Sequence, residues 1–320
     1  MRMLLKKLKD FIDKNRLIEK GSSIGTAVSG GPDSIFMLTM LNNIKDEYNL
    51  SLAVLHFNHK IRKEADEEEL FVKEVAEKMN LNFISETCNV MEFKKKHKLS
   101  LEEAARIKRR EFFIKARKTL NLDFVATGHT VNDAIETMLM HLIKGSSLNG
   151  LVSLKPKNGF FIRPILCFRK DEIQSFLDKN NIEYKIDKSN FEENYTRNRI
   201  RHRLLPLLEE FNPNILNTLF RELEILAEDA KLLENIAEIE FIKRIQITDD
   251  KAIIDFNSLH SASIRRRIIS ETIKQLTGNI YSISFENIER INNIEKNSRV
   301  HLRKLIKAYT KDDKLIIEKW

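Results

Sequence analysis

The sequence predicts an α/β fold in which a parallel sheet carries helices on both of its faces. Short apolar runs alternate with segments of helical periodicity along the first half of the chain, which is typical of βαβ units. A glycine-rich turn joins the first apolar run to the first helical segment, where such sheets place their ligand sites. The length of 320 residues suggests about two domains, which we expect at residues 1–210 and 211–320.

The elements of the first domain follow from these patterns in order. An amphipathic stretch at residues 1–20 predicts a helix. Ser100 and Glu103 form a capping box, which marks the start of a later, basic helix. The expected strands are 24–28, 51–57, 82–86 and 123–127, and the helices that alternate with them are 33–45, 64–79, 100–119 and 131–143.

The rest of the chain predicts a linker helix and a small α+β domain. Residues 145–150 have the composition of a loop, which could be a mobile flap, and a segment of less regular pattern precedes the linker. The further elements that we expect are a hairpin turn at 155–159, a helix at 169–180, the segment 187–203, the long linker helix 214–245, mixed short elements at about 250–320 and a hairpin at 308–317.

The composition is that of a soluble globular chain, with 42% hydrophobic and 32% charged residues. Because no apolar run approaches the ~18 residues that a membrane span needs, we expect no membrane segment. The two cysteines, Cys88 and Cys167, lie far apart, which fits a reducing cytoplasm and argues against a disulfide framework or a structural zinc site.

The net charge of +8 is concentrated in clusters. Residues 94–118 hold eleven Lys or Arg against three Glu, and four arginines alternate with other residues at 197–203. Residues 265–267 are three consecutive arginines. Each cluster alone is compatible with a solvated helix face, but the three together favour a polyanionic partner such as nucleic acid.

The glycine-rich turn predicts a phosphate site. Two glycines allow successive backbone N–H groups to point into one concavity, and a proline suits the first turn of the helix that follows. Two hydroxyl groups and the positive end of the helix add to the attraction for an anion. The turn consists of Ser29, Gly30, Gly31, Pro32, Asp33 and Ser34.

Asp33 makes the prediction for this turn more specific. A carboxylate beside a phosphate repels it unless a divalent cation lies between them, so Asp33 predicts a Mg²⁺ ligand and the turn a nucleoside triphosphate site. The lysine of the G-x-x-x-x-G-K-[ST] loop is missing. The alternative is an ordinary glycine turn between a strand and a helix.

Two acids follow another predicted strand end. His129 follows the strand at 123–127, and Asp133 and Glu136 lie three residues apart on the next helix, so they share one face. Such a pair could bind a cationic substrate, hold magnesium or remove a proton from an amine. Glu136 could instead form a surface pair with a lysine. His56 and His59 lie at the end of the second predicted strand. Each could be either a packed residue or a ligand.

Arginines supply the opposite charge. Arg109 lies on the capped helix, where its guanidinium could meet a phosphate of ATP, the RNA backbone or an acid. In a helix Arg197 and Arg201 share one face, while Arg199 and Arg203 share roughly the opposite one. At most one of these two pairs can therefore face the catalytic pocket.

These motifs together resemble the bacterial tRNA(Ile)-lysidine synthetases of the shorter type, a branch of the PP-loop ATP pyrophosphatases with the signature SGGxDS. The resemblance covers roughly residues 20–210, and beyond it the chain matches only in length and general character. Asn132, Ala134 and Arg110 depart from the usual pattern, which puts fine substrate positioning in doubt. Besides the turn, the matching strings are 56–62, 101–106, 126–133, 136–137, 163–166, 187–190 and 195–201.

The resemblance implies a defined reaction. ATP, with Mg²⁺, would adenylate the C2 oxygen of the wobble cytidine of an isoleucine tRNA with a CAU anticodon and release pyrophosphate. The ε-amine of L-lysine would then expel AMP and leave lysidine, which changes codon and amino-acid specificity from methionine to isoleucine. The resemblance also suggests a homodimer.

By the same resemblance each site residue receives a role. Asp133 and Glu136 would contact the lysine and help to deprotonate it. Arg109 and Arg201 would meet phosphates, and His129 would line the pocket. Residues 211–320 and the basic clusters would bind the tRNA by shape and phosphate.

Three other functions remain open at this point. A tRNA thiolase of the same superfamily typically needs a cysteine cluster, which two distant cysteines do not supply. A small-molecule synthetase such as a GMP or NAD synthetase gives no reason for the arginine clusters or for the string at 187–201. A non-enzymatic RNA-binding module has no use for Asp33 beside a phosphate site.

Overall fold

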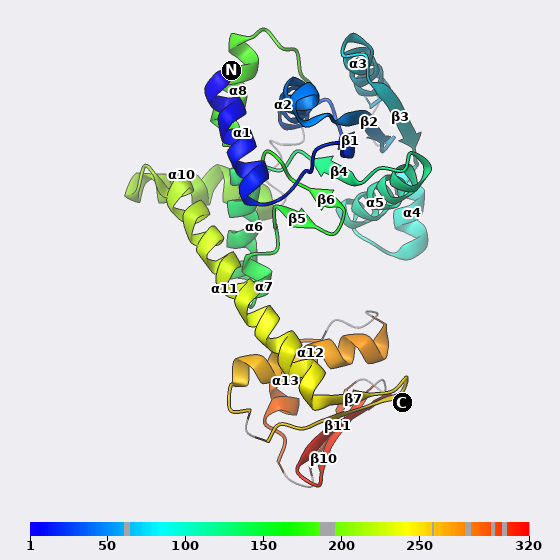
Figure 1. Ribbon diagram of the computed structural model, residues 1–320, viewed down its shortest axis with the longest axis vertical. Coiled ribbons are helices and arrows are strands. Elements are labelled where there is room, and N and C mark those ends of the chain that lie inside the picture. Colours follow the sequence, from blue (N-terminus) through cyan, green and yellow to red (C-terminus); the bar gives the residue numbers. More distant parts are fainter. Residues whose placement is uncertain are drawn as a thin grey trace. The chain divides into compact units, whose positions relative to one another are not determined.

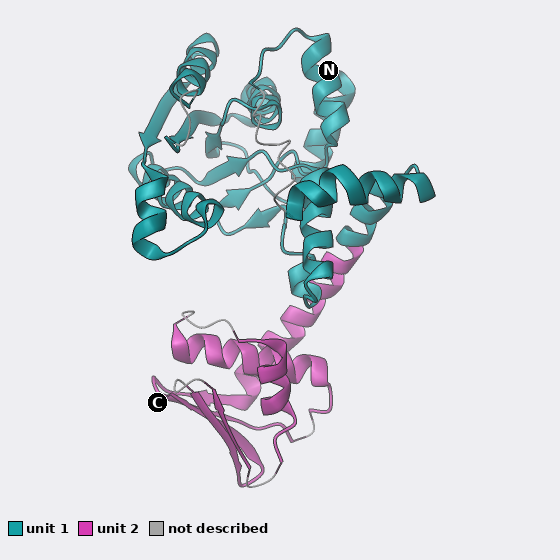
Figure 2. Ribbon diagram, turned by 180° about the vertical axis from the view of Figure 1, so that it is seen from behind, with its two compact units in different colours: residues 1–224 teal, residues 225–320 magenta. Residues whose placement is uncertain are grey.

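The computed structural model describes residues 1–60, 65–185, 196–257, 259–278, 283–295, 298–302 and 306–319 (Figure 1). They form two compact units, residues 1–224 and 225–320 (Figure 2). The division falls inside the long helix α11 (Ile215–Arg244), which confirms the expected helix at 214–245. The boundary that we expected at residue 210 lies inside the preceding helix α10 (Leu205–Phe211), before the division that the structure shows. The functions assigned to the two domains stay a prediction.

The first unit contains a six-stranded sheet with the order β3-β2-β1-β4-β6-β5. All neighbouring strands are parallel except β5 and β6, which form an antiparallel hairpin. This confirms the predicted α/β class. A hairpin is present close to the turn predicted at 155–159, but its turn lies at residues 159–160, because 157–158 form strand β5. The strands are β1 (Ser23–Ala27), β2 (Ser51–Asn58), β3 (Asn82–Thr87), β4 (Phe124–Thr127), β5 (Lys157–Asn158) and β6 (Phe161–Ile162).

Helices cover both faces of this sheet, with α2 (Pro32–Tyr48) and α5 (Leu101–Thr119) on opposite sides (Figure 1). The ring of Phe36 on α2 meets Phe168 and Phe176 edge to face, with ring centroids 5.1 and 5.3 Å apart, which joins α2 to α8 (Lys170–Lys179). On the other face α5 buries Phe112 and Phe113 in a cluster with β2 and β4. Aromatic burial on each face therefore fixes the layers.

The remaining helices agree with most of the sequence-based expectations. The helix predicted at 1–20 ends earlier, α4 was not predicted, and α7 turns the second half of the predicted 145–150 loop into one helical turn. The first part of the segment 187–203 lies outside the described residues. These helices are α1 (Arg2–Lys14), α3 (Ala65–Lys78), α4 (Val90–His97), α6 (Val131–Ile143), α7 (Leu148–Leu151), α9 (Thr196–Arg199) and a π-helix at Ile200–Leu204.

The second unit packs two helices and the end of α11 against an antiparallel sheet with the order β7-β8-β11-β10-β9. Asp312 and Asp313 adopt positive φ values of 51° and 58° and form the two-residue turn of the predicted hairpin. This confirms the small α+β domain. Its elements are β7 (Ile245–Ile247), β8 (Lys251–Ile254), α12 (Ala262–Thr277), α13 (Phe285–Asn292), β9 (Arg299–Leu302), β10 (Ile306–Lys311) and β11 (Lys314–Lys319).

Among the residues that the structure describes, no helix combines the length and the apolar content that crossing a bilayer requires.

Candidate active site

The candidate site lies where the chain reverses its direction of travel across the sheet. From β1 the chain builds β2 and β3 on one side, and it then returns to the other side of β1 as β4. Ala27 and Thr127 pair in parallel register, so the loops that follow β1 and β4 start side by side. Open α/β sheets bind ligands in the crevice at such a switch point.

Gly128 brings these two loops into direct contact. A Cβ atom at this position would stand 3.2 Å from backbone atoms of both Asp33 and Ser34, which is closer than side chains usually approach. A glycine here therefore lets the loop after β4 lie against the turn after β1 without displacing the backbone of that turn. The structure thus brings together the glycine-rich turn and the segment around His129, as the sequence predicted.

The turn at 29–34 is held in shape by its own hydrogen bonds. Ser34 Oγ donates to the carbonyl oxygen of Gly31 at 2.9 Å and accepts from the N–H of Ser29 at 3.2 Å. Gly30 has a φ of +91°, which favours glycine, and Pro32 occupies the first turn of α2. The first N–H groups of a helix lack intrahelical partners, so this end of α2 attracts an anion.

The carboxylate of Asp33 lies at this same turn, with 26% of its side chain exposed. Burial raises its pKa to about 6, and the neighbouring Asp133 adds to the rise while the Lys170 ammonium, 4.0 Å away, opposes it. Asp33 therefore remains mostly ionised at neutral pH, but its charge is poorly solvated. A cation that reached it would relieve this cost.

The pKa of Asp133 is shifted in the opposite direction from that of Asp33. Its Oδ2 atom accepts from the N–H and the hydroxyl of Thr130, both at 2.9 Å, and so caps α6. Its Oδ1 atom lies 3.5 Å from Lys170 Nζ and 3.4 Å from Arg197 Nη2. Burial alone would raise the pKa of Asp133, but the charges of Lys170 and Arg197 lower it to about 2.

Glu136 has no exposed surface and is held by two arginines. Its Oε1 atom accepts from Arg201 Nε at 2.6 Å, and its Oε2 atom accepts from Arg197 Nε at 2.7 Å and Arg201 Nη2 at 2.9 Å. The alternative of a surface pair with a lysine is therefore wrong. Arg199 and Arg203 are exposed, which confirms that only one pair of this cluster reaches the acids.

Lys170 is a member of this group that the sequence analysis missed. It begins α8, and its backbone N–H donates to Asn132 Oδ1 at 3.0 Å, which ties the start of α8 to that of α6. Its ammonium lies between Asp33 and Asp133. The site thus groups three carboxylates, Asp33, Asp133 and Glu136, with three cations, Lys170, Arg197 and Arg201.

His129 and Arg109 approach the same edge of the sheet. His129 Nδ1 lies 3.0 Å from Thr127 Oγ1, and burial lowers the pKa of His129 to about 4. Its imidazole is therefore neutral at pH 7. Arg109 is exposed on α5, and its charge contributes to the lowered pKa values of His129 and His59. His56 is buried and donates through Nδ1 to the carbonyl oxygen of Val28 at 2.8 Å.

The side chains at this site suit magnesium, which needs only one or two carboxylates from the protein, better than a metal that is held by protein ligands alone. Within the described ranges, no group of three or more His, Cys, Asp or Glu side chains could hold a metal ion. Magnesium usually binds through one or two carboxylates together with substrate phosphates and water. One carboxylate, Asp33, beside the turn that we expect to bind phosphate meets that requirement.

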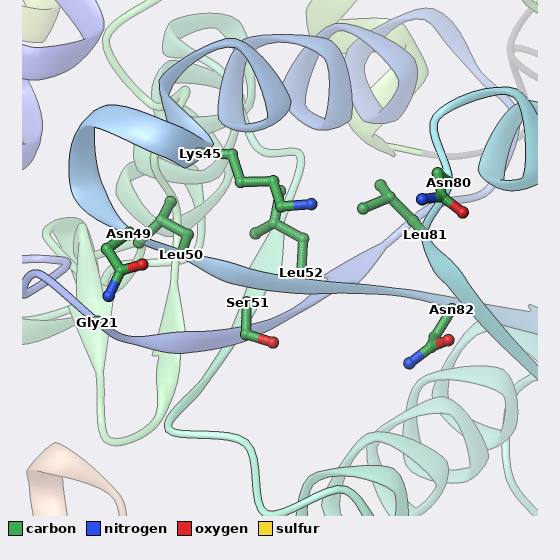
Figure 3. Close-up of a pocket in the computed structure, with 9 residues that line it drawn as sticks. All are labelled: Gly21, Lys45, Asn49, Leu50, Ser51, Leu52, Asn80, Leu81 and Asn82. Carbon is green, nitrogen blue, oxygen red and sulfur yellow. The ribbon is translucent and has the colours of Figure 1, made fainter.

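A cavity of about 360 Å³ lies at the other end of the strands (Figure 3). Its lining comes from the last turn of α2, the amino-terminal ends of β2 and β3 and the turns before β1, β2 and β3, opposite the edge that carries the acids. No carboxylate contributes to it, so we do not place the chemistry there. The lining residues are Gly21, Lys45, Asn49, Leu50, Ser51, Leu52, Asn80, Leu81 and Asn82.

The three consecutive arginines of α12 are engaged within the second unit. Arg265 donates to the carbonyl oxygen of Asn292 at 2.9 Å, and Arg266 pairs with Glu289 on α13. Arg267 donates to Ser263 Oγ at 2.6 Å. This cluster therefore supports nucleic-acid binding less than its sequence suggested. The lysines of α4 and α5 and of the turn between them are more accessible, with Lys95, Lys96, Lys98, Lys115 and Lys118 exposed.

Comparison with known proteins agrees with this geometry. Residues 2–208 match the family of the PP-loop domain. The tRNA(Ile)-lysidine synthase of Clostridioides difficile is 34% identical over 98% of this chain and 70% of its own length. That of Clostridium tetani is 34% identical over 90% of this chain and 62% of its own length, and that of Thermosipho africanus is 35% identical over 89% and 69%. The chain thus spans between three fifths and three quarters of the length of these relatives.

A solved structure shows the same fold. The U34-tRNA thiolase NcsA from Methanococcus maripaludis, which carries a [4Fe-4S] cluster, superposes with a TM-score of 0.58 over 70% of this chain and 78% of its own. At 19% identity this likeness concerns the fold alone. The sequence relatives are closer, and with them the PP-loop match, the turn at 29–34 and the grouped acids lead to one conclusion. The chain belongs to the PP-loop family and, within it, to the tRNA(Ile)-lysidine synthases.

Proposed function

We propose that this chain uses ATP to ligate L-lysine to C2 of the wobble cytidine of an isoleucine tRNA with a CAU anticodon. The reaction gives lysidine, AMP and pyrophosphate, and it changes the codon and amino-acid specificity of the tRNA from methionine to isoleucine. The observation that carries the proposal is the position of Asp33: it lies beside a phosphate-binding turn and shares Lys170 with Asp133.

In this proposal the turn at 29–34 binds the triphosphate through backbone N–H groups and the start of α2. Arg109 and Arg201 approach the phosphates, and His129 lines the nucleotide pocket as a neutral imidazole because of its low pKa, about 4. Asp33 holds Mg²⁺, which supplies neutralisation of phosphate charge when bound. Such a site accelerates adenylation mainly by positioning and by electrostatic stabilisation.

Asp133 anchors the ammonium of the substrate lysine. With a pKa of about 2 it stays ionised at every physiological pH, so it attracts a cation well and accepts a proton poorly. Glu136 reaches the lysine only if the ammonium replaces one of its arginine partners, since Arg197 and Arg201 occupy both of its oxygens. The free ammonium has an ordinary pKa of about 10.4, and attack on C2 requires that it lose a proton.

The partners in this proposal are isoleucine tRNA, free L-lysine, ATP and a second copy of the chain, in the cytoplasm. The exposed lysines of α4 and α5 contact the tRNA backbone, and the wobble cytidine leaves the loop stack to reach the site. Thiolase chemistry is disfavoured, because Cys88 and Cys167 belong to no C-x-x-C cluster.

The test is lysine transfer to RNA. The purified chain is incubated with an unmodified transcript of isoleucine tRNA, ATP, Mg²⁺ and radiolabelled lysine. We expect label in the tRNA with one AMP per lysine, and none with a methionine tRNA transcript or with the Asp33→Asn variant. Absence of label with the wild-type chain, under conditions in which it binds the transcript, would contradict the proposal.

A further inference from the structure

Lys170 is the most loosely held of the three cations at the acidic site. Its Nζ atom lies 3.5 Å from Asp133 Oδ1 and 4.0 Å from Asp33 Oδ2, and 32% of its side chain is exposed. The two arginines of the site are bound to Glu136 by hydrogen bonds of 2.6, 2.7 and 2.9 Å. Since a short charged hydrogen bond is stronger than a longer ion pair, Lys170 is the cation that leaves these acids with the least loss.

The backbone of Lys170 is fixed, whereas its ammonium is not. The backbone N–H donates to Asn132 Oδ1 at 3.0 Å and lies at the start of α8. The side chain is a flexible stem that ends in a compact point charge. The ammonium can therefore move by rotation of the side chain while α8 stays in place.

This ammonium occupies the position that the proposed substrate needs. Asp133 Oδ2 caps α6 through Thr130, so an incoming ammonium meets Oδ1, which is the atom that Lys170 approaches. Free L-lysine carries the same ammonium on the same stem. Lys170 and an L-lysine molecule therefore compete for one oxygen of Asp133.

A bound triphosphate gives Lys170 a second partner. Asp33, its other acid, belongs to the turn at 29–34, so phosphates on that turn would attract the ammonium, and a metal ion on Asp33 would take that acid from it. We propose that Lys170 blocks the lysine position at Asp133 until a triphosphate binds at this turn, so that L-lysine binds after ATP. This inference rests on the proposed use of ATP and L-lysine.

The exchange keeps the charge at Asp133 balanced, because one ammonium replaces another. It also couples the two ligands: if ATP raises the affinity for L-lysine, L-lysine raises the affinity for ATP by the same factor. The alternative is a permanent ion pair, in which Lys170 stays on both acids in every state. In that case L-lysine binds equally well with and without nucleotide.

Calorimetric titration of L-lysine into the full chain tests this order. Mg²⁺ is present throughout, tRNA is absent, and α,β-methylene-ATP, which cannot be cleaved at the α–β bond, is present or omitted. We expect the analogue to lower the dissociation constant for L-lysine at least about tenfold. Without nucleotide, Lys170→Met should bind L-lysine at least about fivefold more tightly than wild type, and the analogue should then change the constant less than about twofold.

Three further variants separate the charge of Lys170 from its shape. Lys179→Met, at the exposed end of the same helix, is the matched control and should behave as wild type. Lys170→Arg keeps the cation and should retain at least about a threefold effect of the analogue. Circular dichroism checks that each variant is folded, and Lys170→Gln takes the place of the methionine variant if that one does not fold.

The outcomes distinguish this order of binding from the ligation itself. Equal affinity of the wild type for L-lysine with and without the analogue would overturn the order. So would a Lys170→Met variant that keeps the full effect of the analogue, or one that no longer binds L-lysine in either state. A wild-type chain that transfers lysine to tRNA, and yet binds L-lysine equally well without nucleotide, would overturn the order alone and leave the proposed function standing.

Discussion

Replacement of Asp33 by asparagine should stabilise the fold while it abolishes the reaction. The Asp33 carboxylate is mostly buried beside Asp133, and this environment raises its pKa from 3.8 to about 6. A raised carboxyl pKa means that the folded state disfavours the charged form. Asparagine has nearly the same shape and carries no charge, so it removes this penalty together with the proposed magnesium ligand.

The size of the effect follows from the pKa difference. Each pKa unit corresponds to about 1.36 kcal/mol, so the shift sets an upper bound of about 3 kcal/mol on the penalty above pH 6. Since 26% of the side chain is exposed, we expect a gain of about 1–2 kcal/mol in the free energy of unfolding. The penalty fades as the pH falls from about 6 to about 4, because the folded-state carboxyl then becomes protonated.

Urea unfolding at two pH values measures this gain in the free energy of unfolding. Without nucleotide and with EDTA present, the Asp33→Asn variant should gain about 1–2 kcal/mol near pH 7.5 and less than half of that near pH 4.5. AMP release should fall at least about a hundredfold, while affinity for tRNA changes less than about twofold. A variant less stable than wild type near pH 7.5, or an equal gain at both pH values, would refute the electrostatic reasoning. Equal loss of tRNA binding and AMP release would refute the role of Asp33.

Three further substitutions probe the neighbourhood of the site and the second unit. Glu136→Gln should lower the free energy of unfolding by about 2–3 kcal/mol, because it removes the buried charge that two arginines share. Urea unfolding at neutral pH measures this decrease, and a change below about 0.5 kcal/mol would contradict the prediction. Gly128→Ala should lower the free energy of unfolding by about 1–2 kcal/mol and weaken ATP binding in calorimetry, because the added methyl group meets the backbone of the turn at 29–34. Wild-type values of both quantities would show that the two loops do not need this close approach. Arg266→Ala should lower stability by less than about 1 kcal/mol and leave tRNA affinity unchanged, whereas a decrease of about one in the salt dependence of tRNA binding would show a phosphate contact.

The sequence predicted the parts of the fold whose signals are local. Pro32 after two glycines marked the junction of β1 and α2, and Ser100 marked the start of α5. The spacing of Asp133 and Glu136 placed both acids on one face of α6, and the spacing of Arg197 and Arg201 placed both arginines on one face of their segment. The pairing of these arginines with Glu136 was not predicted and comes from the structure. Strand–turn–helix signals and helical periodicity suffice for such predictions.

The missed features depend on partners that are distant in sequence. Lys170 gave no local signal, because one lysine at the start of a helix resembles many others until its acids are located. The arginines at 265–267 looked like a surface for polyanions, but Glu289 on the next helix pairs with Arg266. The helix α4 was missed because it is short and rich in lysine, so it shows little apolar periodicity.

A crystal structure with ATP and Mg²⁺ gives the most direct test. The account places the α- and β-phosphates against the backbone of residues 29–34, with the metal ion on the carboxylate of Asp33. A nucleotide bound elsewhere in the chain, with that turn empty and Asp33 still beside Lys170, would contradict it.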